Sequence, residues 1–312
     1  MKMITRFLAL ALAVSLPAVL SAKIQRTVEK TFTVQPGGLL KALTQGGDVR
    51  IKTADTTEMH IVARETIHAS DDAEADKLLE DLKLTFEQTG NEVTVEAKYD
   101  RSSGFHFGSW PPVQVSFEVT VPKAFNLDLK TSGGDIAVAS LKGNVKAHTS
   151  GGELKFERID GEIDAGTSGG DIELQEGTAR ARLSTSGGNI KVERAGGPTE
   201  VSTSGGDIRL DSVAELIGAS TSGGNVKANI TGPIKRDTVL STSGGDVHVT
   251  VAKGTAFELD ASTSGGEVKA SGLTLTIEKG GVGKSRLAGA VNGGGSTLKL
   301  RSSGGDITIE SE

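Results

Sequence analysis

The stretch Thr131-Ser132-Gly133-Gly134-Asp135-Ile136 decides the fold, because the same phrase returns along most of the chain. The first glycine of the phrase recurs at steps of 18, 21 and finally 39 residues, at Gly133, Gly151, Gly169, Gly187, Gly205, Gly223, Gly244, Gly265 and Gly304. Self-similarity at a fixed period is typical of an array of stacked structural units.

Each 18-residue unit divides into two halves with the same pattern. Residues 132–140 read SGGDIAVAS and residues 141–149 read LKGNVKAHT, so a glycine turn precedes alternating apolar and polar positions in both halves. Alternation predicts half-buried strands, with Ile136 and Val145 inward and Lys146 outward. An isolated strand pair is barely stable, but stacked coils share one core. We therefore predict an all-β protein, a β-solenoid (β-helix) of 18–21-residue coils.

The residues around each turn have their own expected roles. The glycine pairs are expected to supply positive φ angles where the chain reverses. The threonine before each phrase, such as Thr149, is expected to point inward and to bond along the stack through its hydroxyl group. Side chains such as Asp135 and Asp171 would form an acidic row beside the turns. Such a row is an alternative Ca²⁺ site, although the calcium-binding nonapeptide pattern is not matched.

Composition narrows the possible functions. The chain has 312 residues and no cysteine, which excludes disulfides, thiolate metal sites and a catalytic cysteine. Its net charge is −6, and loss of Lys2 and Arg6 with an N-terminal leader leaves −8. An acidic chain with interspersed charges argues against nucleic acid as a partner. No sequence feature indicates a cofactor.

Residues 1–22 are predicted to be a signal peptide. Lys2 and Arg6 precede an apolar run that ends in small residues, which favours cleavage after Ala22. An uncleaved anchor is the alternative. No later run is long and apolar enough to span a membrane. We therefore expect an exported protein of the periplasm, the cell surface or the medium.

Residues 23–125 form a β-rich N-terminal segment with one predicted helix at about 71–82. Ser70 is the expected cap, and Asp71, Asp72 and Glu74 suit the first turn. An apolar stripe of leucines follows, so the helix is expected to cover an open end of the coil. From residue 126 to 312 the regular repeats continue. The acidic last strand, residues 306–310, is expected to be the final edge and to resist end-to-end association.

Residues 99–112 (YDRSSGFHFGSWPP) are the most unusual stretch. Glycines and prolines predict a loop that carries four of the eleven aromatic residues. Tyr99, Phe105, Phe107 and Trp110 are candidate binding residues, since clustered aromatics can stack on sugars or contact a partner. The alternative is that they pack into the core.

Three catalytic or metal-binding patterns are not supported. Residues 281–285 resemble the end of a phosphate-binding loop, but Glu278 stands where that motif needs a glycine. Residues 166–170 match G-x-S-x-G, yet Ser168 is one copy of the repeat serine. The five histidines have no metal-ligand spacing. We predict no enzyme, no catalytic residue and no metal site.

Three segments carry a resemblance to a known family: the repeat phrase, the entry sequence at 121–127 and the tail that leads into SSGGDITIE. They resemble a bacterial family of unknown function that is labelled putative adhesin. The resemblance covers most of the chain after residue 22. It implies a β-solenoid and offers no catalytic residues to carry over.

Three functions are compatible with these observations. The first is an exported, non-enzymatic adhesion or interaction surface for an unidentified protein or glycan. The second is a structural or sensory periplasmic envelope protein that binds a protein partner. The third is a carbohydrate-active β-helix enzyme, which the dispersed outward carboxylates do not favour.

Overall fold

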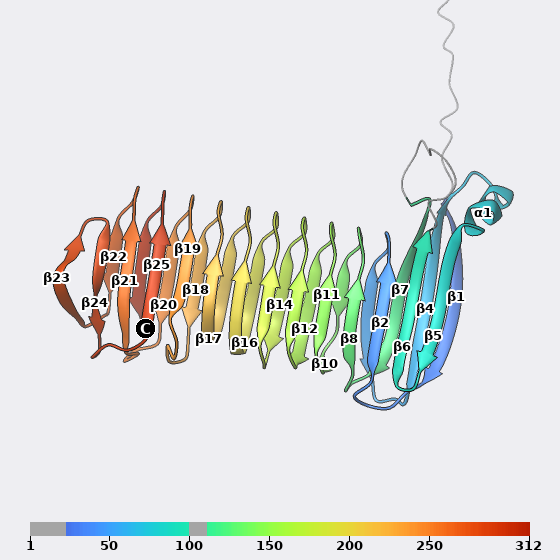
Figure 1. Cartoon of the computed structure of the whole chain (residues 1–312), viewed down its shortest axis with the longest axis horizontal. Helices are drawn as coiled ribbons and strands as arrows, with labels where there is room; N and C mark the ends of the chain where they lie inside the picture. Colours follow the sequence, from blue (N-terminus) through green and yellow to red (C-terminus); the bar gives the residue numbers. More distant parts are fainter. Residues whose placement is uncertain (1–22, 100–110) are drawn as a thin grey trace, which may run out of the picture.

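The described residues form an elongated all-β molecule with one helix. The computed structural model describes residues 23–99 and 111–312. Figure 1 shows the strands in a long row, with β1 and α1 at one end and β23 at the other. Hydrogen bonds join all 26 described strands into one continuous sheet that wraps around a single core. The all-β prediction with one short helix is confirmed, and the architecture is solenoid-like.

Two broad faces run along the molecule. Face A contains, in spatial order, β5 (Leu82–Thr89), β6 (Glu92–Tyr99), β2 (Leu39–Thr44), β8 (Asn126–Lys130), β11 (Val145–His148), β13 (Ile163–Gly166), β15 (Ala181–Ser184), the second halves of β16 (Ile190–Ser202) and β17 (Ile208–Ser220), β19 (Thr238–Thr242), β25 (Thr297–Ser302), β21 (Phe257–Thr263), β24 (Arg286–Val291) and β23 (Leu275–Gly283).

Face B lies on the other side of the core. It contains β1 (Lys23–Thr33), β4 (Glu58–His68), β7 (Val113–Pro122), β3 (Val49–Ala54), β9 (Ile136–Val138), β12 (Leu154–Asp160), β14 (Ile172–Gly177), the first halves of β16 and β17, β18 (Val226–Ile230), β20 (Val247–Val251), β26 (Ile307–Ser311) and β22 (Val268–Ser271). The short β10 (Leu141–Lys142) pairs with the end of β12 at a corner between the faces.

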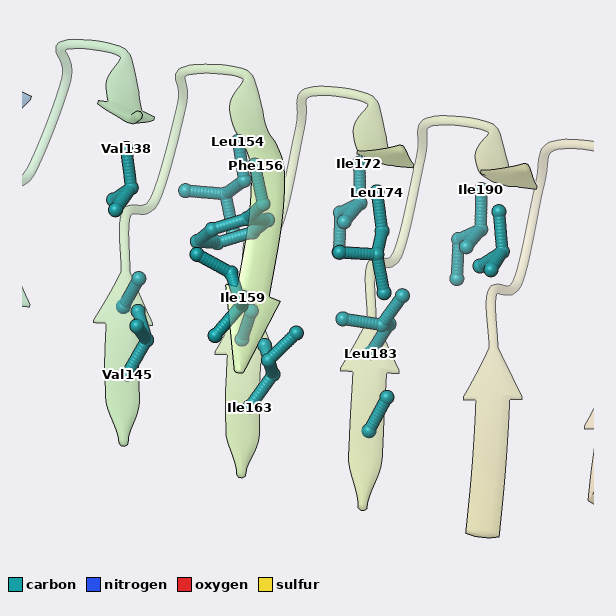
Figure 2. Close-up of a cluster of buried hydrophobic side chains, with 14 of the residues drawn as sticks. Val138, Val145, Leu154, Phe156, Ile159, Ile163, Ile172, Leu174, Leu183 and Ile190 are labelled. Carbon is teal, nitrogen blue, oxygen red and sulfur yellow. The ribbon is translucent and has the colours of Figure 1, made fainter. Parts of the chain in front are cut away.

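Through the regular part, each residue pairs in parallel with its equivalent one repeat later. Val145 lies opposite Ile163, and Ile172 lies opposite Ile190. The inward residues predicted from alternation are buried, as Figure 2 shows for the side chains that fill the space between the two faces. Ile136, Leu154 and Ile172 are each at most 1% exposed. Burying one such aliphatic side chain contributes about 1.5–3 kcal/mol, and the repeat multiplies this gain.

The threonine prediction is confirmed in a more specific form. The Thr149 hydroxyl donates to the carbonyl oxygen of Gly134 in the preceding coil, over 2.9 Å. It also accepts the backbone N–H of Gly152 in its own coil, over 3.3 Å. The hydroxyl therefore ties two successive turns through their backbones rather than through a neighbouring threonine.

The expected reason for the glycine pairs is wrong. Among the described residues, no glycine of the repeated pairs has a positive φ. The second glycine of each pair is instead required by close contact, because the turns stack directly on one another. A Cβ atom on Gly134 would lie 2.2 Å from the carbonyl oxygen of Gly47, and one on Gly206 would lie 2.1 Å from that of Gly188.

The N-terminal end is formed by β1 and β5, with helix α1 (Asp72–Leu79) at its corner. The helix is shorter than the predicted 71–82. Asp71, not Ser70, is its N-cap, and its side chain accepts the backbone N–H of Glu74 over 2.8 Å. The Ser70 hydroxyl donates to the Glu74 carboxylate, which completes the turn. Ala75 is buried, and the Asp76 carboxylate pairs with Arg26 of β1 at 2.6 Å.

The last coil is inserted out of sequence order. Strand β25 pairs with β19 on one side and β21 on the other, and β26 lies between β20 and β22. In Figure 1 the red β25 lies among orange strands of earlier sequence. The expectation that residues 306–310 form the final edge is therefore wrong. The hairpin of β23 and β24 occupies the outer side of β21, so β25 pairs with the inner side.

Candidate functional site

Side chains of the acidic row beside the turns form hydrogen bonds with the backbone of the next coil. The Asp207 Oδ1 atom accepts the backbone N–H of Asn225 in the next coil over 2.7 Å, and Asn225 Oδ1 accepts that of Asp246 over 2.8 Å. Asp and Asn serve equally here because both place a carbonyl-type oxygen at the same reach. The hydrogen bond from the backbone N–H of Glu267 is the main reason why the pKa of Asp306 lies below its ordinary value. Within residues 23–99 and 111–312, no cluster of carboxylates and histidines has metal-binding geometry.

Face A carries one column of outward side chains with alternating charge. Successive strands β2, β8, β11, β13, β15 and β16 place these residues in register: Lys41, Asp128, Lys146, Asp164, Arg182 and Glu200. Neighbouring strands in a sheet are about 4.8 Å apart, so like charges recur at about 9.6 Å. Each charge has an opposite charge on the adjacent strands, so no like charges are direct neighbours in the column.

The two ends of this column are already paired. Lys41 forms an ion pair with Glu92 at 2.5 Å, and Arg182 pairs with Glu200 at 2.9 Å. In the described part of the chain, Asp128, Lys146 and Asp164 have no ion pair within 4.0 Å. The Oδ1 atom of Asp128 is buried and has no hydrogen-bond partner there. The middle of the column therefore holds charges whose interactions are incomplete.

A groove of about 640 Å³ lies over this middle section. The side chains that line it come from β8, β11, β13, β15 and the turns before them, and include Asp128, Lys146, Asp164 and Arg182. A neighbouring groove of about 400 Å³ is lined by Lys130 and His148, among others. Both grooves lie on face A over β8 and β11, which makes this part of face A the region with the most concave surface described here.

His148 and Gly166 shape the second column of this region. The two residues are register partners on β11 and β13. A Cβ atom on Gly166 would lie 3.3 Å from Cδ2 of His148 and 3.2 Å from Oγ of Ser184, so the imidazole and the hydroxyl flank the bare backbone. The Nδ1 atom of His148 is buried without a hydrogen-bond partner among the described residues. The His148 and Ser184 side chains therefore cover the backbone of Gly166, which is buried.

Face B differs because its charges are paired with one another more completely. Lys191 contacts Glu173 at 3.0 Å and Glu193 at 2.9 Å. Arg209 pairs with Asp211 at 2.7 Å, and Glu118 pairs with Lys52. The hydrogen bond from Lys191 is the main reason why the pKa of Glu193 is lowered. The incomplete charges of face A are therefore not a general property of this surface.

Of the four predicted aromatic binding residues, the structure describes only Tyr99. Tyr99 ends β6 with its side chain 2% exposed, and its backbone N–H donates to the Gln45 side chain over 2.8 Å. Phe105, Phe107 and Trp110 lie outside the described residues, so a binding role for this stretch stays a prediction. The column on face A was missed, although Asp128, Lys146, Asp164, Arg182 and Glu200 follow one another at steps of 18 in the sequence.

Among the helices in the described ranges, none has the length and apolar character needed to cross a membrane. A comparison with curated proteins finds no match.

Several solved structures are similar to this chain over most of its length. A protein of Bacteroides fragilis described as a putative adhesin has 15% identity and a TM-score of 0.42, covering 92% of this chain and 97% of its own. A protein of Parabacteroides merdae with the same description has 12% identity and a TM-score of 0.38, covering 92% and 96%. A Parabacteroides distasonis protein described as a putative lipid binding protein has 15% identity and a TM-score of 0.41, covering 91% and 96%. These similarities are too distant to transfer a function.

The sequence itself matches a family profile over nearly its whole length. The match to Toastrack DUF4097 extends from residue 41 to residue 310 and so includes both faces, the turns and the inserted last coil. The chain belongs to the Toastrack DUF4097 family.

Proposed function

We propose that this chain is an exported, non-enzymatic protein, a rod of 18–21-residue coils that acts as an adhesion or interaction surface. Residues 1–22 would direct export and be removed after Ala22. The rod would hold its outward side chains in fixed rows, which limits the conformational entropy lost when a partner binds.

One observation carries the proposal. The three central charges of face A, on Asp128, Lys146 and Asp164, have no ion pair within the described residues and line a groove of about 640 Å³. A partner with opposite charges facing these three residues would bind more specifically and associate faster. The aromatic residues Tyr99, Phe105, Phe107 and Trp110 remain proposed additional contacts, on the basis of sequence alone.

The decisive experiment is protease accessibility on intact cells compared with osmotically opened cells. A cytoplasmic protein and a periplasmic protein serve as controls for leakage. Digestion on intact cells would support the surface role and justify a screen of glycans and matrix proteins. Protection until the outer membrane is opened would overturn an adhesin role and favour a structural or sensory envelope protein. A full-length, uncleaved and cytoplasmic protein would overturn export itself.

A further inference from the structure

We propose that face A binds face A of a second copy of this chain, with the two rods antiparallel. The pairing would follow a two-fold axis that lies in the interface, runs parallel to the strands and passes between β11 and β13. This inference names the partner of the surface proposed above, and it rests on that proposal only in using the same face.

The charge order of the column is self-complementary under this axis. From β2 to β16 the column reads positive, negative, positive, negative, positive, negative, at Lys41, Asp128, Lys146, Asp164, Arg182 and Glu200. A two-fold axis parallel to the strands reverses the order of the coils and keeps each column opposite itself. Lys146 then faces Asp164 of the second copy, Asp128 faces Arg182, and Lys41 faces Glu200.

The other face-to-face orientation is disfavoured by the same column. An axis along the rod would keep the order of the coils, so that Lys146 would face Lys146 and Asp164 would face Asp164. Juxtaposed like charges oppose association. The sequence of charges therefore selects the antiparallel arrangement.

The flanking columns are compatible with the antiparallel pairing. In the column that contains His148, the axis brings His148 opposite Gly166, which has no side chain of its own, and Lys130 opposite Ser184. In the column on the other side, it brings Asn126 opposite Arg180 and Asn144 opposite Glu162. None of these pairs places like charges together.

The centre of the column has the greatest need for a partner. Lys41 and Arg182 already have ion pairs within the chain, at 2.5 Å and 2.9 Å. In the part of the chain that the structure describes, Asp128, Lys146 and Asp164 have none. A second copy would therefore supply its largest electrostatic gain at the two-fold axis, which is where an isologous contact repeats each pair twice.

The expected association is weak and salt-dependent. Six strands at about 4.8 Å spacing give a contact about 24 Å long, which is small for a stable dimer. Its specificity would come from exposed ion pairs, which salt screens. We expect a monomer–dimer equilibrium whose dissociation constant rises as NaCl is added.

Sedimentation velocity of the purified protein without residues 1–22 tests the pairing over a concentration series at low and high salt. Lys146→Glu places two acidic groups opposite each other, and Asp164→Lys places two basic groups opposite each other. Each single variant is expected to weaken dimerisation by about tenfold or more. An equimolar mixture of the two variants is expected to dimerise, because the glutamate introduced in one variant then faces the lysine introduced in the other. The double variant Lys146→Glu with Asp164→Lys is expected to recover self-association.

Two controls separate the contact from folding. Lys227→Glu makes the same charge change on face B, in a strand whose neighbours are β17 and β20, and is expected to leave dimerisation unchanged. Circular dichroism establishes that each variant is folded, and Lys146→Gln replaces Lys146→Glu if the latter unfolds.

A protein that stays monomeric at every soluble concentration would overturn the proposal. So would dimerisation that is equally strong in both single variants, or a mixture that stays monomeric. These measurements use purified protein, so their failure would leave the cell-surface experiment and its outcome unaffected.

Discussion

The Ser302 hydroxyl donates to the carbonyl oxygen of Gly245 over 2.9 Å, although 57 residues separate the two. The Thr263 hydroxyl in turn donates to the carbonyl oxygen of Gly305 over 2.7 Å. The last coil of the chain thus makes the same turn-to-turn contacts as every earlier coil, but between two coils that precede it in sequence. The hydrogen bonds between stacked turns are the same at every coil, so they do not fix the order of the coils.

The order of the coils can be tested with introduced cysteines, since the chain has none of its own. Val239 and Lys299 are outward register partners on β19 and β25, whereas Asp260 lies one strand further, on β21. Val239→Cys with Lys299→Cys is expected to form a disulfide, because adjacent strands meet the Cα distance that the bond requires. Val239→Cys with Asp260→Cys is the matched control. A disulfide in the control alone, detected by non-reducing electrophoresis, would show sequential stacking instead.

Neighbouring inward and outward positions of one strand should respond very differently to substitution. Ile172→Asp buries a charge between Leu154 and Ile190 and is expected to abolish folding of the array, because an unpaired buried charge costs several kcal/mol. Glu173→Gln is outward and is expected to lower the free energy of unfolding by at most about 0.5 kcal/mol. Urea denaturation followed by circular dichroism measures both. Equal tolerance of the two changes would contradict the assignment of inward and outward faces.

The two glycines of one turn should differ as well. Gly134→Ala places a Cβ atom 2.2 Å from the carbonyl oxygen of Gly47, so the stacked turns must separate. The nearest atom to a Cβ on Gly133 is the Gly46 carbonyl oxygen, at 4.0 Å. We expect a loss of about 2 kcal/mol or more for Gly134→Ala and a change near zero for Gly133→Ala. Thermal unfolding of both variants is the measurement, and a larger effect at Gly133 would count against contact as the reason for the glycine pair.

The buried threonine hydroxyls should contribute measurably. Thr185→Val keeps the shape of the side chain but removes the bonds to the Gly170 carbonyl oxygen, at 2.9 Å, and the Gly188 N–H, at 3.3 Å. Two backbone groups then lose their partner, so we expect a loss of about 1–3 kcal/mol. Thr185→Ser retains the hydroxyl and serves as the control. If the Thr185→Val variant were as stable as the unmodified protein in urea denaturation, these hydrogen bonds would make no net contribution to stability.

Glu65 should make the stability of the folded protein depend on pH. It occupies an inward position of β4 with 6% exposure, and burial raises its pKa above the ordinary value of 4.5, while nearby Arg26 partly opposes that change. The ionised carboxylate therefore destabilises the folded state above the raised pKa. This cost falls as the pH drops toward 4.5, below which the group is protonated in both states.

Glu65→Gln is accordingly expected to raise the melting temperature by a few degrees at neutral pH. The difference from the unmodified protein should shrink as the pH approaches 4.5. Differential scanning calorimetry at several pH values measures it. A lower melting temperature for the variant at neutral pH would show that the attraction of Arg26 outweighs burial.

Much of the fold could be predicted from period and alternation. Ile136 and Val145 were assigned to the core correctly because a strand exposes its two sides alternately, whatever its partner is. The threonine hydroxyl bonds along the stack as expected. The glycine pairs were recognised as turn residues, but for the wrong reason, since the distance between stacked turns is not visible in one coil's sequence.

The candidate site was only partly accessible from sequence. The spacing of Asp128, Lys146 and Asp164 was present as a step of 18, but its meaning depends on which side chains find partners across neighbouring strands. The acidic residues beside the turns looked like ligands for a cation. Hydrogen bonds such as the one from the Asn225 N–H to Asp207 show that they hold the coils together.

The sequence by itself determined the repeat, its inward and outward residues and the charge order from Asp128 to Glu200, because these follow from local periodicity. The place of Lys41 beside Asp128 depends on the pairing of β2 with β8. Only the tertiary structure decided the order of the last coils and the ends of the rod. Every coil offers nearly the same hydrogen bonds to its neighbours, so local chemistry permits several orders. Strand β24 pairs antiparallel with one edge of β21, so that edge cannot pair with β25. The last coil therefore pairs with the other edge of β21 and lies between β19 and β21.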